Sequence, residues 1–421
     1  MLKVELHTHE IPDIFANFKN IVGEEHWLRR VKLIKQSIKG HIYLKDHFHK
    51  ENSIAFALSK YSACIKKYGG IPLQEIENRE LYPAISFAAQ TLSIIEHASN
   101  QQKKALTRRI HGAFKNPGDM RAIQLEMLAA THFVRQGYPI SWPEMDETGN
   151  FDLLVNDIGS NGLEVECKSI SRDKGKKIHQ FEIHEFYNLI AKEIKPIIRD
   201  LEVGLSVVLT VPERLPSQHS KRKALANRIG NQILAAHSKS FEDGCDIRIT
   251  EFDFYSNFDN VSSAHGAIDI DMIDQITETK NRGAAVIGNH CGGGVIFVVQ
   301  SRQDDTLLDS IFNTLNRSAK NQLNKTRPAL FLVGFHDLEI NALYEIAQHD
   351  ADSQNPPTPL RIGVSNFLSS KNRDHIVSIS FIGDELLTTK KNGDLTSGGA
   401  SYTFTKEESI FWHKDFIKIL Q

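Results

Sequence analysis

The chain has 421 residues, which is enough for two or three domains that each bury a core of their own. Its hydrophobic fraction of 40% and charged fraction of 24% are those of an ordinary soluble globular protein, and no stretch reaches the roughly 18 apolar residues that a membrane span requires. The composition therefore excludes a membrane-spanning protein, while a formal net charge of −2 does not by itself indicate a nucleic-acid binder.

The N-terminal part of the sequence is basic and has helical periodicity. From about Ile14 to Ile110 the apolar residues recur at helical spacing, and basic residues outnumber acidic ones through Lys115. This charge pattern suits a phosphate-rich substrate, and it equally suits a solvated helical surface. We predict an all-helical basic domain over residues 1–116. The basic clusters in it are Arg29-Arg30, Lys66-Lys67, Lys103-Lys104 and Arg108-Arg109.

An α/β region is predicted over residues 117–260. It begins at a break, Asn116-Pro117-Gly118-Asp119, after which Asp119 can cap a helix that ends near Gly137. Strands and helices then alternate closely, which is typical of an α/β unit. The expected strands are 139–142, 151–156, 163–169, 205–211 and 246–254, and the expected helices are 179–198 and 221–237.

A C-terminal α/β extension is predicted over residues 261–421. Strands are expected at 285–288, 295–300 and 329–335, with a helix over 307–323 between the last two. The stretch 361–405 is predicted to be mostly β. Its pattern leaves open whether it completes the central sheet or forms a separate small domain.

Charged residues cluster around the predicted strands 151–156 and 163–169. These two runs flank a turn rich in Gly, Asn and Asp, so they are expected to form an antiparallel hairpin. Alternation along the second run places Glu164, Glu166 and Lys168 on one face. Asp152 lies in the neighbouring strand. We therefore expect Asp152, Glu166 and Lys168 to converge.

Two converging carboxylates repel each other unless a cation neutralises them or one of them is protonated. Mg²⁺ suits Asp152 and Glu166 because it prefers oxygen ligands and keeps water and phosphate oxygens in its shell, and Mn²⁺ is expected to substitute for it. Lys168 can then polarise the attacking water and offset the charge of the transition state. This is the chemistry of phosphodiester hydrolysis.

The pattern Asp152, a spacer and Glu166-x-Lys168 resembles the PD-(D/E)XK nuclease superfamily. The resemblance covers roughly residues 119–211, about a quarter of the chain, and includes the order helix, three strands, helix, strand. It implies a restriction-endonuclease-like mixed central sheet flanked by helices. It also implies that Asp152, Glu166 and the Cys167 carbonyl bind the metal, that Lys168 acts on the water, and that Glu126 supports the site or a second metal. Phe151 stands where many members have proline.

Several residues after the motif are predicted to bind substrate. Lys174, Lys176 and Lys177 form a basic loop with Arg172, well placed for phosphate. Gln180, His184 and Tyr187 open the next helix at spacing loosely similar to the Gln and Tyr of helicase-associated members of the superfamily.

Three other patterns are interpreted as structural. Leu6-His7-Thr8-His9 resembles the opening of some metal-dependent hydrolases, but the chain lacks their regular barrel rhythm, and exposed histidines explain His7, His9 and the second pair His47/His49 better. His290-Cys291 and the glycines after it suit a turn between strands. The four cysteines (Cys64, Cys167, Cys245 and Cys291) form no Cys-x-x-Cys pair, so we expect reduced thiols and no structural zinc site.

The sequence therefore predicts a Mg²⁺-dependent nuclease that most readily acts on DNA, as a homo-oligomer or with a partner subunit. There is no phosphate-binding Gly-x-x-x-x-Gly-Lys-Ser/Thr loop, so any ATP-driven step belongs to a partner. The N-terminus has no apolar segment of a secretory signal, which favours a cytoplasmic protein, and analogy suggests bacterial defence against foreign DNA. The alternatives are a catalytically inactive binding or scaffold subunit with the nuclease fold, and a hydrolase acting through His7 and His9.

Overall fold

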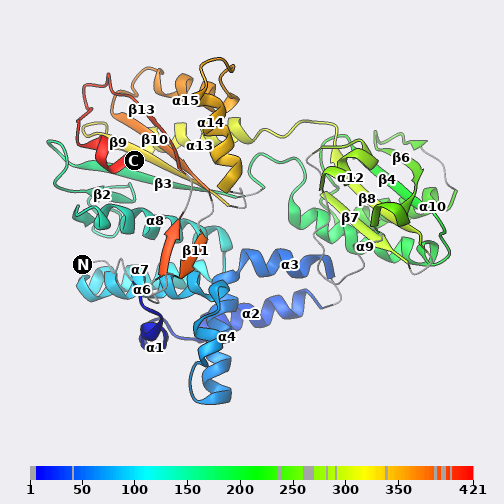
Figure 1. Ribbon diagram of the computed structural model, residues 1–421, viewed down its shortest axis with the longest axis horizontal. Coiled ribbons are helices and arrows are strands. Elements are labelled where there is room, and N and C mark those ends of the chain that lie inside the picture. Colours follow the sequence, from blue (N-terminus) through cyan, green and yellow to red (C-terminus); the bar gives the residue numbers. More distant parts are fainter. Residues whose placement is uncertain are drawn as a thin grey trace. The chain divides into compact units, whose positions relative to one another are not determined.

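The structure, a computed structural model, divides into two compact units (Figure 1). The first comprises Met1–Gln36, His49–Lys174 and Leu307–Gln421, and the second comprises Ser37–Phe48 and Gly175–Thr306. The chain leaves the first unit twice, over Ser37–Phe48 and again over Gly175–Thr306. The predicted domain boundaries near residues 116 and 260 stay a prediction. The residues described are 6–39, 42–171, 173–235, 239–258, 270–280, 283–289, 292–336, 340–383, 386–389, 395–398 and 401–420.

The N-terminal region is helical, as predicted. In α1 the buried residues Ile11, Ile14, Phe15, Phe18 and Val22 repeat at helical spacing, which gives the helix one apolar face to pack on the core. No helix among the described residues is long and apolar enough to cross a membrane. The helices are η1 (Thr8–Glu10), α1 (Ile11–Val22), α2 (Glu25–Ser37), α3 (Ile42–Glu51), α4 (Ser53–Tyr68), α5 (Leu73–Ile76), η2 (Arg79–Leu81), α6 (Tyr82–His97) and α7 (Asn100–Ala113).

A mixed sheet of six strands forms the centre of the first unit. Its spatial order is β1-β2-β3-β9-β10-β13. The β1–β2–β3 meander and the β10–β13 pair are antiparallel, whereas β9 runs parallel to both of its neighbours, β3 and β10. The strands are β1 (Ile140–Ser141), β2 (Leu153–Val155), β3 (Leu163–Ile170), β9 (Ala329–Phe335), β10 (Ile376–Ile382) and β13 (Ser401–Thr405).

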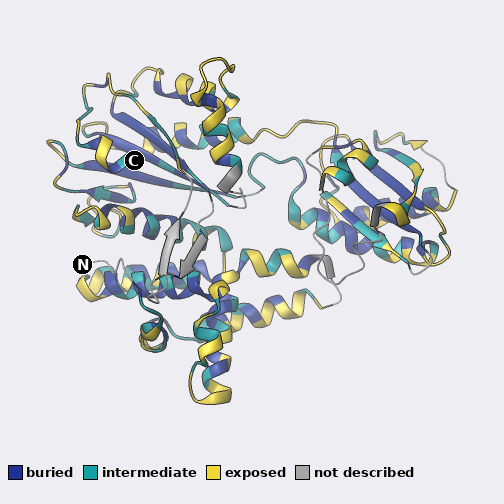
Figure 2. Ribbon diagram, in the orientation of Figure 1, coloured by how far each residue is buried: buried dark blue, intermediate teal, exposed yellow. Residues whose placement is uncertain are grey.

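Helices cover both faces of this sheet, and Figure 2 shows its central strands buried between them. On one face Leu163, Val165 and Cys167 of β3 share a core with α8 (Pro117–Arg135) and the N-terminal helices. On the other face the odd-numbered residues of β9 share a core with α13 (Leu307–Asn321) and α15 (Pro359–Leu368). The prediction of a mixed α/β protein with a helical N-terminal region is confirmed at this level.

One strand predicted to belong with the hairpin lies elsewhere. β4 (Gly204–Val211) pairs with β6 (Asp246–Phe252) and β8 (Gly294–Ser301) in the sheet of the second unit, not with β3. In the first unit the elements that follow β3 are α13 and β9, and β9 takes the parallel position beside β3. An apolar strand can complete either sheet, so its composition could not indicate which one it joins.

The second unit has a five-stranded sheet of its own, in the order β5-β6-β4-β8-β7. Its core with α9 and α10 contains Val207 and Leu209 from β4 and Phe297 from β8. The opposite face of the sheet packs against α12 through Val208. The elements are α9 (Gln180–Ile198), α10 (His219–Ala235), β5 (Lys239–Ser240), β6 (Asp246–Phe252), α11 (Phe254–Phe258), α12 (Ile270–Thr277), β7 (Gly283–Gly288) and β8 (Gly294–Ser301).

The prediction that 361–405 is mostly β is wrong over its first residues, which continue α15. The helix is capped by Thr358, whose side chain accepts the Arg361 N–H at 3.3 Å, and it begins with Pro359, which suits a first turn. Beyond it, β10 and β13 complete the central sheet, which answers the question that the sequence left open. The other elements of this region are α14 (Ile340–Ala351), β11 (Leu386–Thr389), β12 (Leu395–Gly398) and α16 (Phe416–Leu420).

Candidate functional site

The predicted hairpin is present and brings the motif residues together. β2 and β3 are antiparallel, with Leu153 opposite Val165 and Val155 opposite Leu163. The turn between them uses Gly162 with a φ of +76°, where an added Cβ would lie 2.8 Å from the Val155 carbonyl oxygen. Glycine is therefore required for this close approach, and the turn fixes the register of the two strands.

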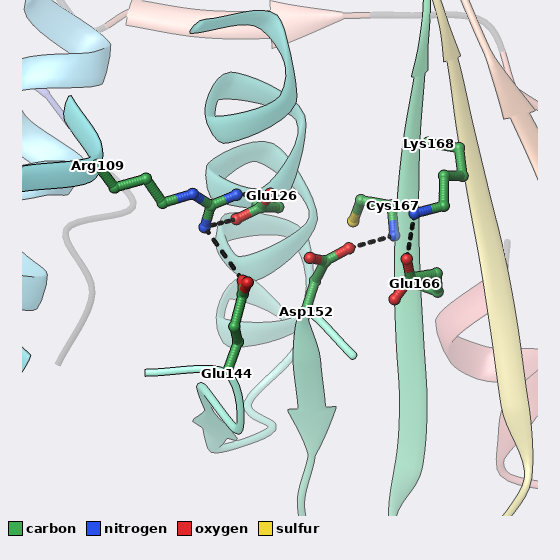
Figure 3. Close-up of polar contacts among 7 residues, drawn as sticks. All are labelled: Arg109, Glu126, Glu144, Asp152, Glu166, Cys167 and Lys168. Atoms are coloured by element: carbon green, nitrogen blue, oxygen red, sulfur yellow. Dashed lines mark hydrogen bonds and ion pairs between the residues drawn. The ribbon is translucent and has the colours of Figure 1, made fainter. Parts of the chain in front are cut away.

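Asp152 immediately precedes β2 and reaches across to β3. Its Oδ2 accepts the main-chain N–H of Cys167 at 2.7 Å. Because Cys167 lies between Glu166 and Lys168, this bond anchors the carboxylate beside both of them (Figure 3). The expectation that Asp152, Glu166 and Lys168 converge is met by this geometry.

Glu166 is fully buried within β3, and its two oxygens have different surroundings. Oε1 accepts a short hydrogen bond from Lys168 Nζ (Figure 3), whereas Oε2 is buried and has no hydrogen-bond partner among the described residues. A buried carboxylate oxygen without a partner is costly, so it marks a position that a bound group can satisfy.

Glu126 lies on α8 and is only 3% exposed. Arg109 of α7 makes a bidentate pair with it. Nη1 donates to Oε2 at 2.7 Å, and Nη2 donates to Oε1 in a shorter hydrogen bond. The same Nη1 lies 3.7 Å from Oε2 of the exposed Glu144, on the loop before β2 (Figure 3). In the sequence Arg109 is visible only as part of a basic cluster, and no local pattern connects it with the acids.

The carboxyl groups are held in surroundings that favour their neutral forms. Burial, and then the charge of Asp152, raises the pKa of Glu166 to about 8, against the opposing effect of Lys168. Burial and Asp152 likewise raise the pKa of Glu126 to about 7, against the effect of Arg109. The pKa of Asp152 is raised mainly by burial. Each of these costs falls when a cation enters the cluster.

The donor set suits a hard divalent cation. Asp152 and Glu166 supply carboxylate oxygens on adjacent strands, one of them the partnerless Glu166 Oε2. In the described part of the chain there is no group of three or more His, Cys, Asp or Glu side chains that could hold a metal ion. The predicted protein ligands are two carboxylate side chains and the Cys167 carbonyl. Water and substrate oxygens would fill the remaining coordination positions, as Mg²⁺ prefers.

The predicted phosphate-binding lysines are divided between the two units. Lys174 ends a segment of the first unit, and its Nζ donates to Thr314 Oγ1 of α13 at 2.9 Å. Lys176 and Lys177 belong to the second unit, where the Lys177 main-chain N–H donates to Asp305 at 2.9 Å. Arg172 lies outside the described residues.

The predicted contacts on α9 also belong to the second unit. Tyr187 is 2% exposed, and its ring packs edge-on against Phe297 with 6.0 Å between centroids. The ring of His184 lies 6.2 Å from that of Tyr187 and 5.5 Å from that of His47. Tyr187 therefore has a core role that sequence spacing did not reveal, whereas Gln180 is half-buried at the start of the helix.

The histidine pairs do not form a metal site among the residues described. His7 and His9 stack on each other, with ring centroids 5.4 Å apart, at the N-terminal η1. His49 stacks on Phe56, with 3.8 Å between ring centroids, and His47 lies against His184 in the second unit. The residues His290 and Cys291 lie outside the described ranges.

Comparison with protein-family models, with curated proteins and with solved structures finds no match to this chain. Its function is therefore inferred from the chemistry of the site.

Proposed function

We propose that the chain is a metal-dependent nuclease that hydrolyses phosphodiester bonds, with DNA as its substrate. The observation that carries the proposal is the convergence of Asp152, Glu166 and Lys168 at the start of the β2–β3 hairpin. Placing the half-buried Asp152 and Lys168 beside the fully buried Glu166 costs stability, which a purely structural role does not explain.

The topology of the first unit supports the same proposal. Along the unit the order is α8, β1, β2, β3, then α13 and β9, with β9 parallel to β3. This is the helix, three-strand, helix, strand order of the PD-(D/E)XK superfamily, with residues 175–306 as an insertion between β3 and α13. The restriction-endonuclease-like fold is thus proposed for different elements from those that the sequence indicated.

The residues of the site divide the chemistry among them. Asp152, Glu166 and the Cys167 carbonyl would hold Mg²⁺ or Mn²⁺, which supplies Lewis acidity and lowers the pKa of bound water. Lys168 contacts Glu166 in this structure, and its ammonium is half-buried beside the carboxylates. Lys168 then orients the attacking water and offsets negative charge that develops on the phosphate. Lys174 and Lys177 remain candidates for phosphate contacts.

The test is cleavage of plasmid and single-stranded DNA with Mg²⁺, Mn²⁺ or EDTA, using Asp152→Asn and Lys168→Met. Each variant should lose roughly 10²–10³-fold in rate, the usual cost of removing one group that stabilises the transition state. Asp157→Asn is the matched control, because Asp157 is exposed on the turn of the same hairpin and has a φ of +58°, which asparagine tolerates.

The outcomes separate the alternative functions. Metal-dependent cleavage that persists in both site variants contradicts the nuclease site proposed here. DNA binding by the wild type without cleavage supports the inactive scaffold instead. Loss of activity only in His7→Ala supports the hydrolase that acts through His7 and His9.

A further inference from the structure

We propose, on the basis of the proposed function, that each site binds a single divalent cation and that Arg109 takes the place of a second one. The family resemblance left open whether Glu126 supports the site or binds a second metal. The contacts of Arg109 favour the first of these roles.

Arg109 engages both oxygens of Glu126, so a metal would have to compete with the guanidinium for this carboxylate. Both carboxylate oxygens accept hydrogen bonds from the two terminal nitrogens of one guanidinium. The side chain of Glu126 is 4% exposed, so a cation could coordinate it only by displacing the guanidinium from a closed environment. Bidentate arginine–carboxylate pairs are among the strong ion pairs of proteins, and arginine keeps its charge at physiological pH.

The charges of the cluster balance with one divalent cation. The acids are Glu126, Glu144, Asp152 and Glu166, and the cationic side chains are Arg109 and Lys168 (Figure 3). When all of them are ionised, the six side chains leave two negative charges, which is the charge that one Mg²⁺ neutralises. A second divalent ion would leave these six side chains with excess positive charge, even with the exposed Glu144 counted among the acids.

Arg109 also links the helical region to the site. It lies on α7, outside the segment that resembles the superfamily, and its side chain remains one-third exposed beside Glu144. A fixed guanidinium at this position supplies positive charge next to the acids without needing a metal ion, and its partial exposure lets a phosphate oxygen approach it. Arg109 is therefore a positioning residue for Glu126 as well as a fixed charge of the site.

The experiment counts bound Mn²⁺ per chain, by electron paramagnetic resonance of the free ion and by calorimetry, without DNA. The wild type should bind one ion, and Asp152→Asn should lose it. Glu126→Gln should also bind one ion, because Glu126 is not a ligand, with a lower affinity because Arg109 loses its counter-charge. Arg109→Gln should bind a second ion through the freed Glu126, and Arg109→Gln combined with Glu126→Gln should return to one. Arg108→Gln, at the exposed neighbouring position on α7, is the matched control and should bind as the wild type does.

Two ions in the wild type, or loss of an ion in Glu126→Gln, would overturn the inference. Neither result depends on Arg109→Gln being stable, since both use proteins that keep the arginine. Cleavage assays on the same samples test the proposed function separately: two bound ions with cleavage reject only the single-cation inference. One bound ion without cleavage contradicts the nuclease and leaves the role of Arg109 standing.

Discussion

The central strands of the two sheets are both largely buried but are built from different residues. β4 in the second unit has the sequence GLSVVLTV, and β3 in the first has LEVECKSI. Seven of the eight residues of β4 are buried, and the only polar one among them is Ser206. In β3, by contrast, Glu164 and Glu166 are both 0% exposed.

Under the proposed function, this difference means that β3 carries charged residues at a cost in stability. A strand with neighbours on both sides and helices on both faces is normally apolar throughout, as β4 is. Glu164 recovers part of its cost because its carboxylate accepts the Asn324 N–H at 3.0 Å, far from the hairpin in sequence. Glu164 and Glu166 each leave one buried carboxylate oxygen without a partner among the described residues, Oε1 and Oε2 respectively. Only Glu166 lies beside Asp152 and Lys168, so its oxygen is the one placed to receive a ligand of the proposed site.

The strongest test of this contrast places a carboxylate in β4. Val207 is 0% exposed and lies in the core with α9 and α10. Val207→Glu should destabilise the second unit by roughly 3–5 kcal/mol, the cost of a buried charge without a partner. Val207→Ala, which only leaves a small cavity, is the control. Calorimetry of both proteins decides, and equal melting temperatures would mean that β4 tolerates charge as β3 does.

The next largest effect is expected from breaking an ion pair in the first unit. Arg109→Gln should lower the free energy of unfolding by about 3 kcal/mol, because Glu126 stays buried without its partner, while the partial exposure of Arg109 limits the loss. Adding Glu126→Gln should restore most of that stability. Urea unfolding measures both, with Arg108→Gln expected within about 0.5 kcal/mol of the wild type. Equal stability of Arg109→Gln and Arg108→Gln would show that the pair contributes nothing.

The sequence predicted what is local in the site and missed what is distant. Glu166 and Lys168 share a strand face by simple alternation, and the turn before them predicts the hairpin that adds Asp152. Arg109 lies on another helix, and its contact with Glu126 depends on how α7 packs against α8, for which the run Arg108-Arg109 was the only signal.

The errors in the fold have the same origin. β9 pairs with β3 although residues 175–306 of the second unit lie between them in sequence. The spacing of apolar residues along a chain does not predict which distant strand a strand pairs with. The nearer strand β4 matched the expected order and was assigned to the wrong sheet. Most of α15 fell within the stretch 361–405 that was predicted to be mostly β, although Thr358 and Pro359 carry the signals of a helix start.

The buried acids also predict a pH dependence that β4 cannot have. The folded-state pKa of Glu166 is raised from 4.5 to about 8, so between these values the folded chain keeps a proton that the unfolded chain has released. Stability without metal should therefore be highest at low pH in this window and fall as the pH rises toward about 8. Glu126, with its pKa raised to about 7, acts in the same direction.

Thermal unfolding in EDTA between pH 5 and pH 8 measures this effect as a shift of a few degrees. Glu166→Gln should flatten the decline, because the amide does not titrate, and Asp157→Asn should leave it unchanged. Addition of Mn²⁺ should raise the melting temperature most at the high-pH end, where the acids are ready to bind it. A decline of the same slope in Glu166→Gln would assign the pH dependence to other groups.

The smallest effect is expected at the glycines that shape the two sheets, and it separates stability from function. Gly162→Ala should cost about 1–2 kcal/mol for its left-handed backbone, plus a contribution from the approach of Cβ to the Val155 oxygen. Gly159→Ala should lose stability only through its left-handed backbone, because Gly159 has a φ of +58° and an added Cβ would have no neighbour closer than 3.5 Å. In the second unit, the Cβ of Gly204→Ala would lie 2.6 Å from the Phe252 ring and strain β4 without touching the acids.

Of the three substitutions, only Gly162→Ala shifts the register that holds Asp152 against β3. It alone should slow cleavage by more than its loss of stability explains. Equal cleavage by Gly162→Ala and Gly204→Ala at matched stability would mean that the hairpin turn does not position the site.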